Sequence, residues 1–135
     1  MMGFEEIEHT ADKALRISGI NLRELMISAA QGMTQLMLGD ASKIPNEIEK
    51  SIELQAADAE SLLVEWLGEL AYWAETEMLV FKKFRIINVT ATRLEAIALG
   101  GKVAELEKHI KAVTYHNLEI MQTPGGLEAT VIFDV

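Results

Sequence analysis

Acidic residues near the two ends of the chain are the strongest candidates for chemistry. The segment Thr130-Val131-Ile132-Phe133-Asp134-Val135 is apolar almost to its end, so it predicts a β-strand that runs to residue 135. On such an ordered backbone, the side chain of Asp134 and the α-carboxylate of Val135 lie within a few ångströms of each other. Two anionic groups held this close repel each other unless a cation or strong donors lie between them.

A third carboxylate, that of Asp12, ends the segment His9-Thr10-Ala11-Asp12, which follows the first apolar stretch of the chain. If both ends of the chain meet, Asp12, Asp134 and Val135 form an oxygen-rich site, which suits Ca²⁺ or Mg²⁺ better than a metal that prefers thiolates. The same residues have an ordinary interpretation, in which Asp12 caps a turn and Asp134 solvates the chain end. Spacing alone leaves both interpretations open.

No motif for a nucleophilic enzyme or a phosphate-binding loop is present. The chain has no cysteine, which excludes disulfides and thiolate ligands, and Gly100-Gly101 is typical of a break in the chain. A metal-dependent hydrolase would use Asp12 and Asp134 as ligands and His9 or His116 as base, but no nucleophile accompanies them. Spacing favours a hydrogen-bonded structural role for His116.

Composition restricts the class of protein. The chain has 135 residues, 50% of them hydrophobic, which predicts one folded domain spanning residues 1–135. The formal net charge is −9, and this argues against autonomous binding of RNA or DNA, because such binding depends on cationic side chains. The basic cluster Lys82-Lys83-Phe84-Arg85 predicts a solvated strand edge. No run is apolar enough to span a membrane and no basic signal-peptide region is visible, so we expect a cytoplasmic protein.

Apolar spacing predicts the elements that position these residues. In the first half we expect strands at 4–9 and 14–20 around the turn at 10–12, a helix from 21 to 39 that begins with the capping pattern Asn21–Glu24, and a strand at 48–54. A second helix begins at 58–61 and carries Trp66 and Trp73 on its apolar face. Gly68 lies in its middle, where we expect another element to pack closely.

The second half of the sequence predicts strands at 79–90, 93–99, 110–121 and 127–135, the last two forming a hairpin. This order of elements predicts an α+β fold, a single domain in which two amphipathic helices pack with antiparallel or mixed β-sheets in layers.

Five colinear segments, which span nearly the whole chain, resemble the archease family. They are Glu8-His9-Thr10-Ala11-Asp12, the helix with Glu24-Leu25 and Ala29-Ala30-Gln31-Gly32-Met33, the run Leu62-Leu63-Val64-Glu65-Trp66-Leu67-Gly68-Glu69-Leu70, the run Lys111-Ala112-Val113-Thr114-Tyr115-His116, and Phe133-Asp134-Val135. The resemblance implies a layered α+β fold. It also implies a protein cofactor of the RtcB-type tRNA-splicing ligase, which joins RNA ends after loading guanylate from GTP onto an active-site histidine.

The resemblance implies that the chain promotes guanylylation and multiple turnover of the ligase and is not itself an enzyme. It further implies a divalent ion, commonly calcium, bound by Asp12, Asp134 and Val135, the carboxylates already selected above. A second role that it allows is that of a chaperone or specificity modulator of another RNA-modifying enzyme, such as a methyltransferase. The acidic surface suits a basic partner in either role.

Two positions depart from the family pattern. Lys13-Ala14 follows the motif aspartate in place of a small aliphatic residue and Gly, and Gly101-Lys102 replaces a Gly-Glu pair. Since the ammonium of Lys13 is adjacent to Asp12 in sequence, we expect it to weaken or compete with a bound cation.

Overall fold

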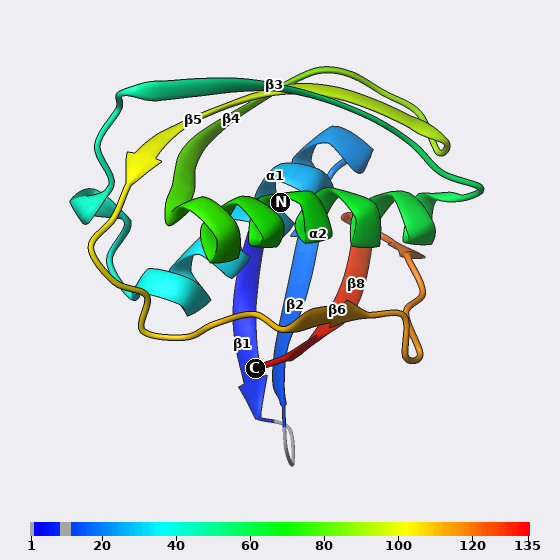
Figure 1. Cartoon of the computed structure of the whole chain (residues 1–135). Coiled ribbons are helices and arrows are strands. Elements are labelled where there is room, and N and C mark those ends of the chain that lie inside the picture. Colours follow the sequence, from blue (N-terminus) through cyan, green and yellow to red (C-terminus); the bar gives the residue numbers. More distant parts are fainter. Residues whose placement is uncertain (1, 9–11) are drawn as a thin grey trace.

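Two helices lie between two antiparallel sheets in the computed structural model, which describes residues 2–8 and 12–135 (Figure 1). The first sheet contains β1 (Gly3–Glu8), β2 (Lys13–Gly19), β6 (Ala112–Thr114), β7 (Met121–Thr123) and β8 (Gly126–Asp134). The second contains β3 (Ile48–Gln55), β4 (Leu79–Val89) and β5 (Arg93–Lys102). The helices are α1 (Leu22–Leu38), α2 (Ala59–Glu77) and the short 3-10 helix η1 (Ala41–Lys43). The predicted layered α+β class is confirmed.

Helix α1 begins and ends as the sequence predicts. The side chain of Asn21 accepts a hydrogen bond from the amide of Glu24, whose carboxylate accepts one from the amide of Ile20. The helix ends at Gly39, which has a φ of 76°, a conformation that glycine adopts without steric cost. Because α1 contacts β2 on one side and β4 on the other, it lies between the two sheets.

Helix α2 packs beside α1 in the same layer. Its Trp66 is fully buried, and the indole N–H donates to the carbonyl of Met26 in α1 at 2.9 Å. Trp73, which the sequence places in the core, is only half-buried and carries the ammonium of Lys50 at 4.6 Å from its ring centroid. Neither helix, in the part of the chain that the structure describes, is long and apolar enough to cross a membrane.

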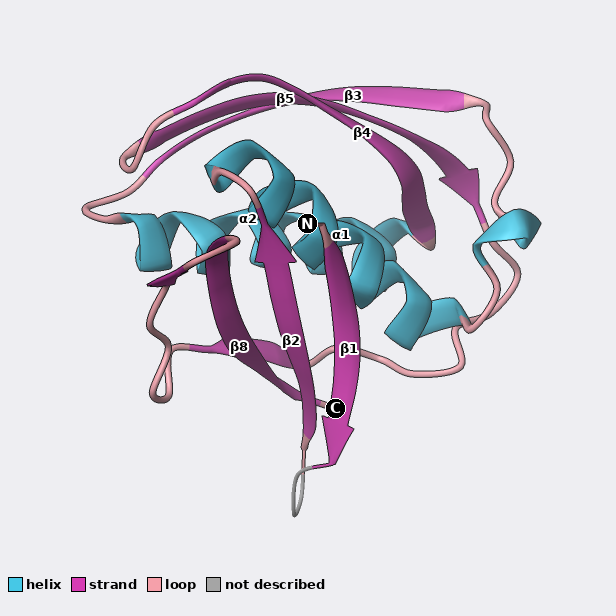
Figure 2. Ribbon diagram, turned by 180° about the vertical axis from the view of Figure 1, so that it is seen from behind, coloured by secondary structure: helices cyan, strands magenta, loops and turns pink. Residues whose placement is uncertain are grey.

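The first sheet has the strand order β1-β2-β8-β6, so β8 lies in its interior (Figure 2). One face packs on the helices through fully or nearly fully buried side chains, among them Leu15, Ile17, Val131 and Phe133. The C-terminus lies at the end of this sheet where β1 leads into β2 (Figures 1 and 2). Residues 9–11 of the predicted turn lie outside the described residues.

The predicted single strand over 110–121 is wrong. A turn interrupts it, in which the amide of Leu118 donates to the carbonyl of Tyr115 and Asn117 has a φ of 53°. The two remaining pieces, β6 and β7, both pair with β8, at its C-terminal and N-terminal ends respectively. β-forming residues on both sides of Asn117 conceal this turn, and among residues 110–121 only Asn117 has a left-handed backbone.

Two expectations about glycines are also corrected. Gly100-Gly101 does not break the chain but lies within β5. Position 100 requires glycine, because a Cβ there would lie 2.0 Å from the carbonyl oxygen of Val80, where β4 bulges. Gly68 has no element packed against it, since a Cβ there would meet nothing within 4 Å. The basic cluster behaves as predicted, with Lys83 and Arg85 exposed on the edge strand β4.

Candidate metal centre

Asp134 is the last residue of β8 and the end of a firmly anchored strand. Its neighbour Phe133 is completely buried, whereas Asp134 is exposed on the opposite face. Successive side chains of a strand point to opposite faces, so burial of Phe133 fixes the outward direction of Asp134. The amide of Lys111 donates to the backbone carbonyl of Asp134 at 2.7 Å, and Ala112 pairs with Asp134 in the β6–β8 ladder.

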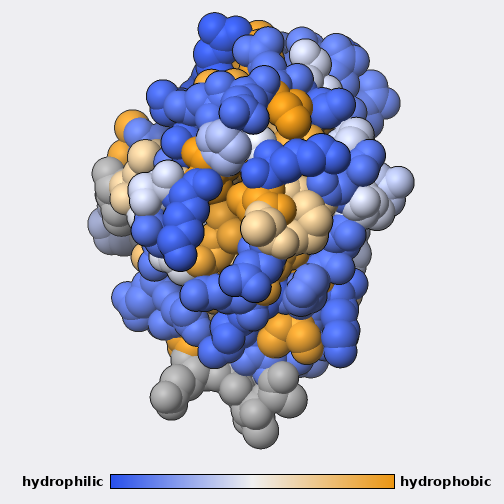
Figure 3. Space-filling view, turned by 60° about the vertical axis from the view of Figure 1, so that its left-hand side comes forward, coloured by the Kyte–Doolittle hydropathy of each residue, from blue (hydrophilic) through white to orange (hydrophobic). Residues whose placement is uncertain are grey.

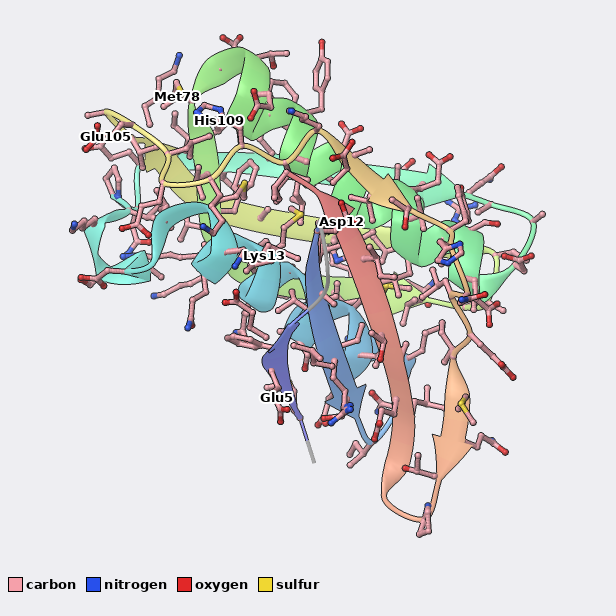
Figure 4. All side chains as sticks on the ribbon, turned by 90° about the horizontal axis from the view of Figure 1, so that it is seen from below. Glu5, Asp12, Lys13, Met78, Glu105 and His109 are labelled. Carbon is pink, nitrogen blue, oxygen red and sulfur yellow. The ribbon has the colours of Figure 1, made fainter. Side chains whose placement is uncertain are left out.

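Asp12 and Asp134 lie at the same end of the β2–β8 pair. Strand β2 pairs with β8 in a register that sets Lys13 opposite Phe133 and Ala14 opposite Ile132. Continued by one residue, this register sets Asp12, in the bend before β2, opposite Asp134. Directly opposed residues in antiparallel strands have Cβ atoms about 4.5–5.5 Å apart. Figure 4 shows Asp12 beside the C-terminal end of β8.

Val135, the third predicted ligand, follows β8 directly. Its side chain is half-buried and packs against the hydrophobic core. The three predicted ligand residues therefore lie at one end of one sheet, contributed by the bend before β2 and by the last residues of the chain.

A row of three apolar side chains and one threonine lies beside these acidic residues on the outward face of the sheet. Ile7, Ala14, Ile132 and Thr114 are paired across four successive strands, β1, β2, β8 and β6. Ala14 is only 2% exposed, although it points away from the helices, since its neighbours in the row cover it. This row depends on strand register, so the order of residues along the chain does not reveal it.

The side chain of Lys13 lies on the opposite face of the sheet from that of Asp134. Its ammonium lies 3.1 Å from a carboxylate oxygen of Glu6 on the neighbouring strand. Lys13 also pairs in register with the buried Phe133, which places it on the helix side of the sheet. Lys13, which is labelled with Asp12 in Figure 4, therefore has a carboxylate partner that the sequence did not reveal.

Comparison with known proteins identifies the family. The sequence model of the Archease protein family matches residues 4–135. The chain belongs to the archease family. It is 38% identical to the archease of Methanosarcina barkeri, over 98% of this chain and 95% of the relative, and 33% identical to that of Methanothermobacter thermautotrophicus over the full length of both.

Solved structures share the fold of this archease-family chain. The solution structure of protein 1598 of Methanobacterium thermoautotrophicum has a TM-score of 0.80 and 33% identity, with both chains fully covered. The crystal structure of an archease from Thermotoga maritima, described as a possible chaperone, has a TM-score of 0.68 and 26% identity over 97% of this chain and 96% of that one. The layered arrangement of helices and sheets is thus shared with these two solved structures.

The donor atoms of the archease-family chain fit a hard cation. The carboxylates of Asp12, Asp134 and Val135 offer oxygen ligands alone, the type that Ca²⁺ and Mg²⁺ prefer. Among the described residues, no group of three or more His, Cys, Asp or Glu side chains comes together. His9 lies outside the described residues, and His116 is exposed, with its ring nitrogen 3.3 Å from the side-chain nitrogen of Asn117.

A separate hollow lies on the side of the molecule that carries η1. Figure 3 brings this side forward and shows apolar atoms, in orange, framed by hydrophilic ones. The hollow has a volume of about 490 Å³ and is lined by apolar and charged residues, namely Leu38, Ser42, Lys43, Ile44, Pro45, Lys102, Val103, Ala104, Glu105 and Glu107. Cationic and anionic side chains are balanced in its walls, so its charge selects neither class of ligand and we assign it no function.

Proposed function

We propose that this archease-family chain is a non-enzymatic activator of an RtcB-type tRNA-splicing ligase in the cytoplasm. It promotes guanylylation and multiple turnover of the ligase in tRNA splicing and RNA repair. One observation supports the proposal: the β2–β8 register, whose last pair is Lys13 with Phe133, brings Asp12 to the end of the sheet that also carries Asp134 and Val135. These are the positions at which the family resemblance implies a divalent ion.

In this proposal, Asp12, Asp134 and Val135 hold calcium or another divalent cation. Bound there, the cation supplies positive charge on an anionic protein and joins the bend before β2 to the end of β8. The residues of the chain provide the geometry. Buried Phe133 fixes the direction of Asp134, and the amide of Lys111 holds its backbone from the other side.

The charge of the chain suits a protein partner more than a nucleic acid. A formal charge of −9 repels phosphates and complements a basic RNA-processing enzyme. Complementary charge of this kind mainly accelerates encounter and adds less to affinity. We therefore propose that the chain contacts the ligase directly and does not bind RNA by itself.

A chaperone of another RNA-modifying enzyme is the second candidate. The description of the Thermotoga maritima archease as a possible chaperone favours this role. Binding assays with purified ligase and with a purified methyltransferase distinguish the two candidates. Selective binding of the methyltransferase would replace the ligase in the proposal.

The decisive experiment measures guanylylation of the cognate ligase by GTP, and its turnover with excess RNA, with and without the chain and calcium. We expect the chain to increase both rates, and Asp12→Asn and Asp134→Asn to lose this effect. Glu128→Gln is the matched control, because it removes a charge from the same strand, beside Arg16. Full activation by both aspartate variants, or no activation by the unmodified chain, overturns the proposal.

A further inference from the structure

Gly68 has no structural explanation within the chain. It lies in the middle of α2, where glycine is a poor helix former, and no other residue approaches the place of its missing side chain. Gly100 shows the contrasting case, in which the backbone of a neighbouring strand requires glycine. The space beside Gly68 therefore remains open on the surface of the folded chain.

This space is part of a hollow of about 260 Å³ between α2 and the segment that leads into β6. It is lined by Gly68, Ala71, Tyr72 and Glu75 of the helix and by Ile110, Lys111, Ala112 and Val113 of the facing segment. Ala71 and Ile110 are buried, at 7% and 3% exposure, and form apolar contact surface. Tyr72 is 58% exposed, which is high for an aromatic side chain.

Helix α2 is strongly acidic, and Glu75 of this helix lines the hollow. The helix contains five glutamates and no lysine or arginine. Glu65 is exposed one turn before Gly68, and Glu69 follows Gly68 directly. Neither carboxylate has an ion-pair partner in the described part of the chain, whereas Glu75 lies 2.8 Å from the ring nitrogen of His109. Unpaired carboxylates beside an apolar floor are complementary to an amphipathic cation.

We propose that this hollow receives a lysine- or arginine-bearing segment of the partner protein. The aliphatic stem of such a side chain covers Gly68 and Ala71, while its charged head reaches Glu65 or Glu69. Lys111 on the opposite wall repels the head and so directs it toward the α2 side. The inference rests on the proposed function for the existence of a protein partner, and it adds where that partner docks.

The position of the hollow supports simultaneous contact with the candidate metal centre. Ala112 lines the hollow and pairs with Asp134 in the adjacent strand. Paired strands lie about 4.8 Å apart, so one partner surface is able to cover both. Figure 1 shows α2 running above β6 and the C-terminus below β6.

A substitution that fills the hollow tests the proposal. Gly68→Leu places a side chain in open space and replaces a poor helix former, so we expect the fold to be retained with an unchanged or higher unfolding midpoint. Ligase binding, measured by titration of the labelled full chain in the presence of calcium, should weaken about tenfold or more, as for a central contact of an interface. Gln35→Leu, which adds an exposed leucine to α1, should bind as the unmodified chain does.

Charge-reversed variants provide a second test of the proposed docking site. The double variant Glu65→Lys/Glu69→Lys should weaken binding and reduce the sensitivity of the association rate to salt. The matched double variant Glu49→Lys/Glu53→Lys changes the net charge equally on exposed positions of β3 and should bind within about twofold of the unmodified chain. Equal losses in the two double variants, or unaltered binding of Gly68→Leu, overturn the inference.

The outcomes separate this inference from the proposed function. If the unmodified chain neither binds nor activates the ligase, the proposed function fails. If it activates the ligase and Asp134→Asn does not, while Gly68→Leu binds normally, only the docking position is wrong.

Discussion

The ammonium of Lys13 lies 3.1 Å from a carboxylate oxygen of Glu6, across the β1–β2 pair. The two side chains are 34% and 51% exposed, so the pair contributes at most about 1 kcal/mol to folding. Its effect on the candidate metal centre is more specific. Glu6 holds a cationic side chain on the helix side of the sheet, whereas Asp134 is on the outward side.

We predict that Glu6→Gln weakens calcium binding by about two- to fivefold, because Lys13 loses its partner and its charge becomes free to approach Asp12. Calorimetric titration of the metal-free chain measures this change. Adding Lys13→Gln to the variant should restore the affinity. Glu5→Gln is the control, since Glu5 is also on β1 but faces Arg16 at 3.7 Å. Equal calcium affinity of Glu6→Gln and the unmodified chain would show that Lys13 is irrelevant to the site.

The positions of the candidate ligand residues were partly predictable from the sequence, because they depend on few residues. An apolar strand that ends in Asp134-Val135 is recognisable from its residues. Asp12 is recognisable from its position just before the second strand, β2. Which strands are neighbours is not a local property. Only the β2–β8 register brings Asp12 to the end of the sheet that carries Asp134, and that register results from packing of residues such as Leu15 and Val131 on the helices.

The failures of prediction have a common physical origin. Gly68 and Gly100 have the same residue type, yet one lies over open space and the other against a backbone oxygen. The surroundings of each glycine are set by contacts between elements that are distant in sequence. The intrinsic helix or strand propensity of glycine does not reveal these contacts. The turn at Asn117 was hidden likewise, since β6 and β7 are both held by β8.

The two glycines give a paired stability prediction. Gly68→Ala should raise the free energy of unfolding by about 0.5–1 kcal/mol, because alanine is the better helix former and its Cβ meets nothing within 4 Å. Gly100→Ala should lower it by about 2 kcal/mol or more, since its Cβ would lie 2.0 Å from the Val80 oxygen. Urea unfolding of both variants measures the difference. A loss of stability in Gly68→Ala would mean that the hollow is not open.

The cap of α2 predicts a pH dependence of stability. The hydrogen bond from the backbone amide of Ser61, and then that from its hydroxyl, lower the pKa of Asp58 from its ordinary value of 3.8. Because the folded state has the lower pKa, this contribution is present above pH 3.8 and is lost as the pH falls through the lowered value. Asp58→Asn keeps a capping oxygen but does not titrate. The stability gap between the two chains in urea should therefore close in acid, and a gap independent of pH contradicts this assignment.

Neutralising Asp134 should have opposite effects with and without calcium. In chelator, Asp134→Asn should melt at the same temperature as the unmodified chain or higher, since repulsion from Asp12 is relieved. With calcium at about a hundred times its dissociation constant, the unmodified chain gains about 2.7 kcal/mol and the variant does not. Calorimetric scans of metal-free protein with calcium or chelator measure this crossover. Equal melting of the unmodified chain in both conditions argues against a cation site.

A short extension after Val135 gives the most specific test of the third ligand. If the α-carboxylate of Val135 binds the cation, one or two added residues turn it into a neutral peptide carbonyl and bring new atoms into the place of the ion. We therefore expect the extension to impair calcium binding and ligase activation as severely as Asp134→Asn. A strand end without a ligand tolerates a short polar tail, because chain termini usually accept added residues. An extension of the same length at the N-terminus is the control. Normal calcium binding and normal guanylylation with the C-terminal extension would remove Val135 from the ligand set.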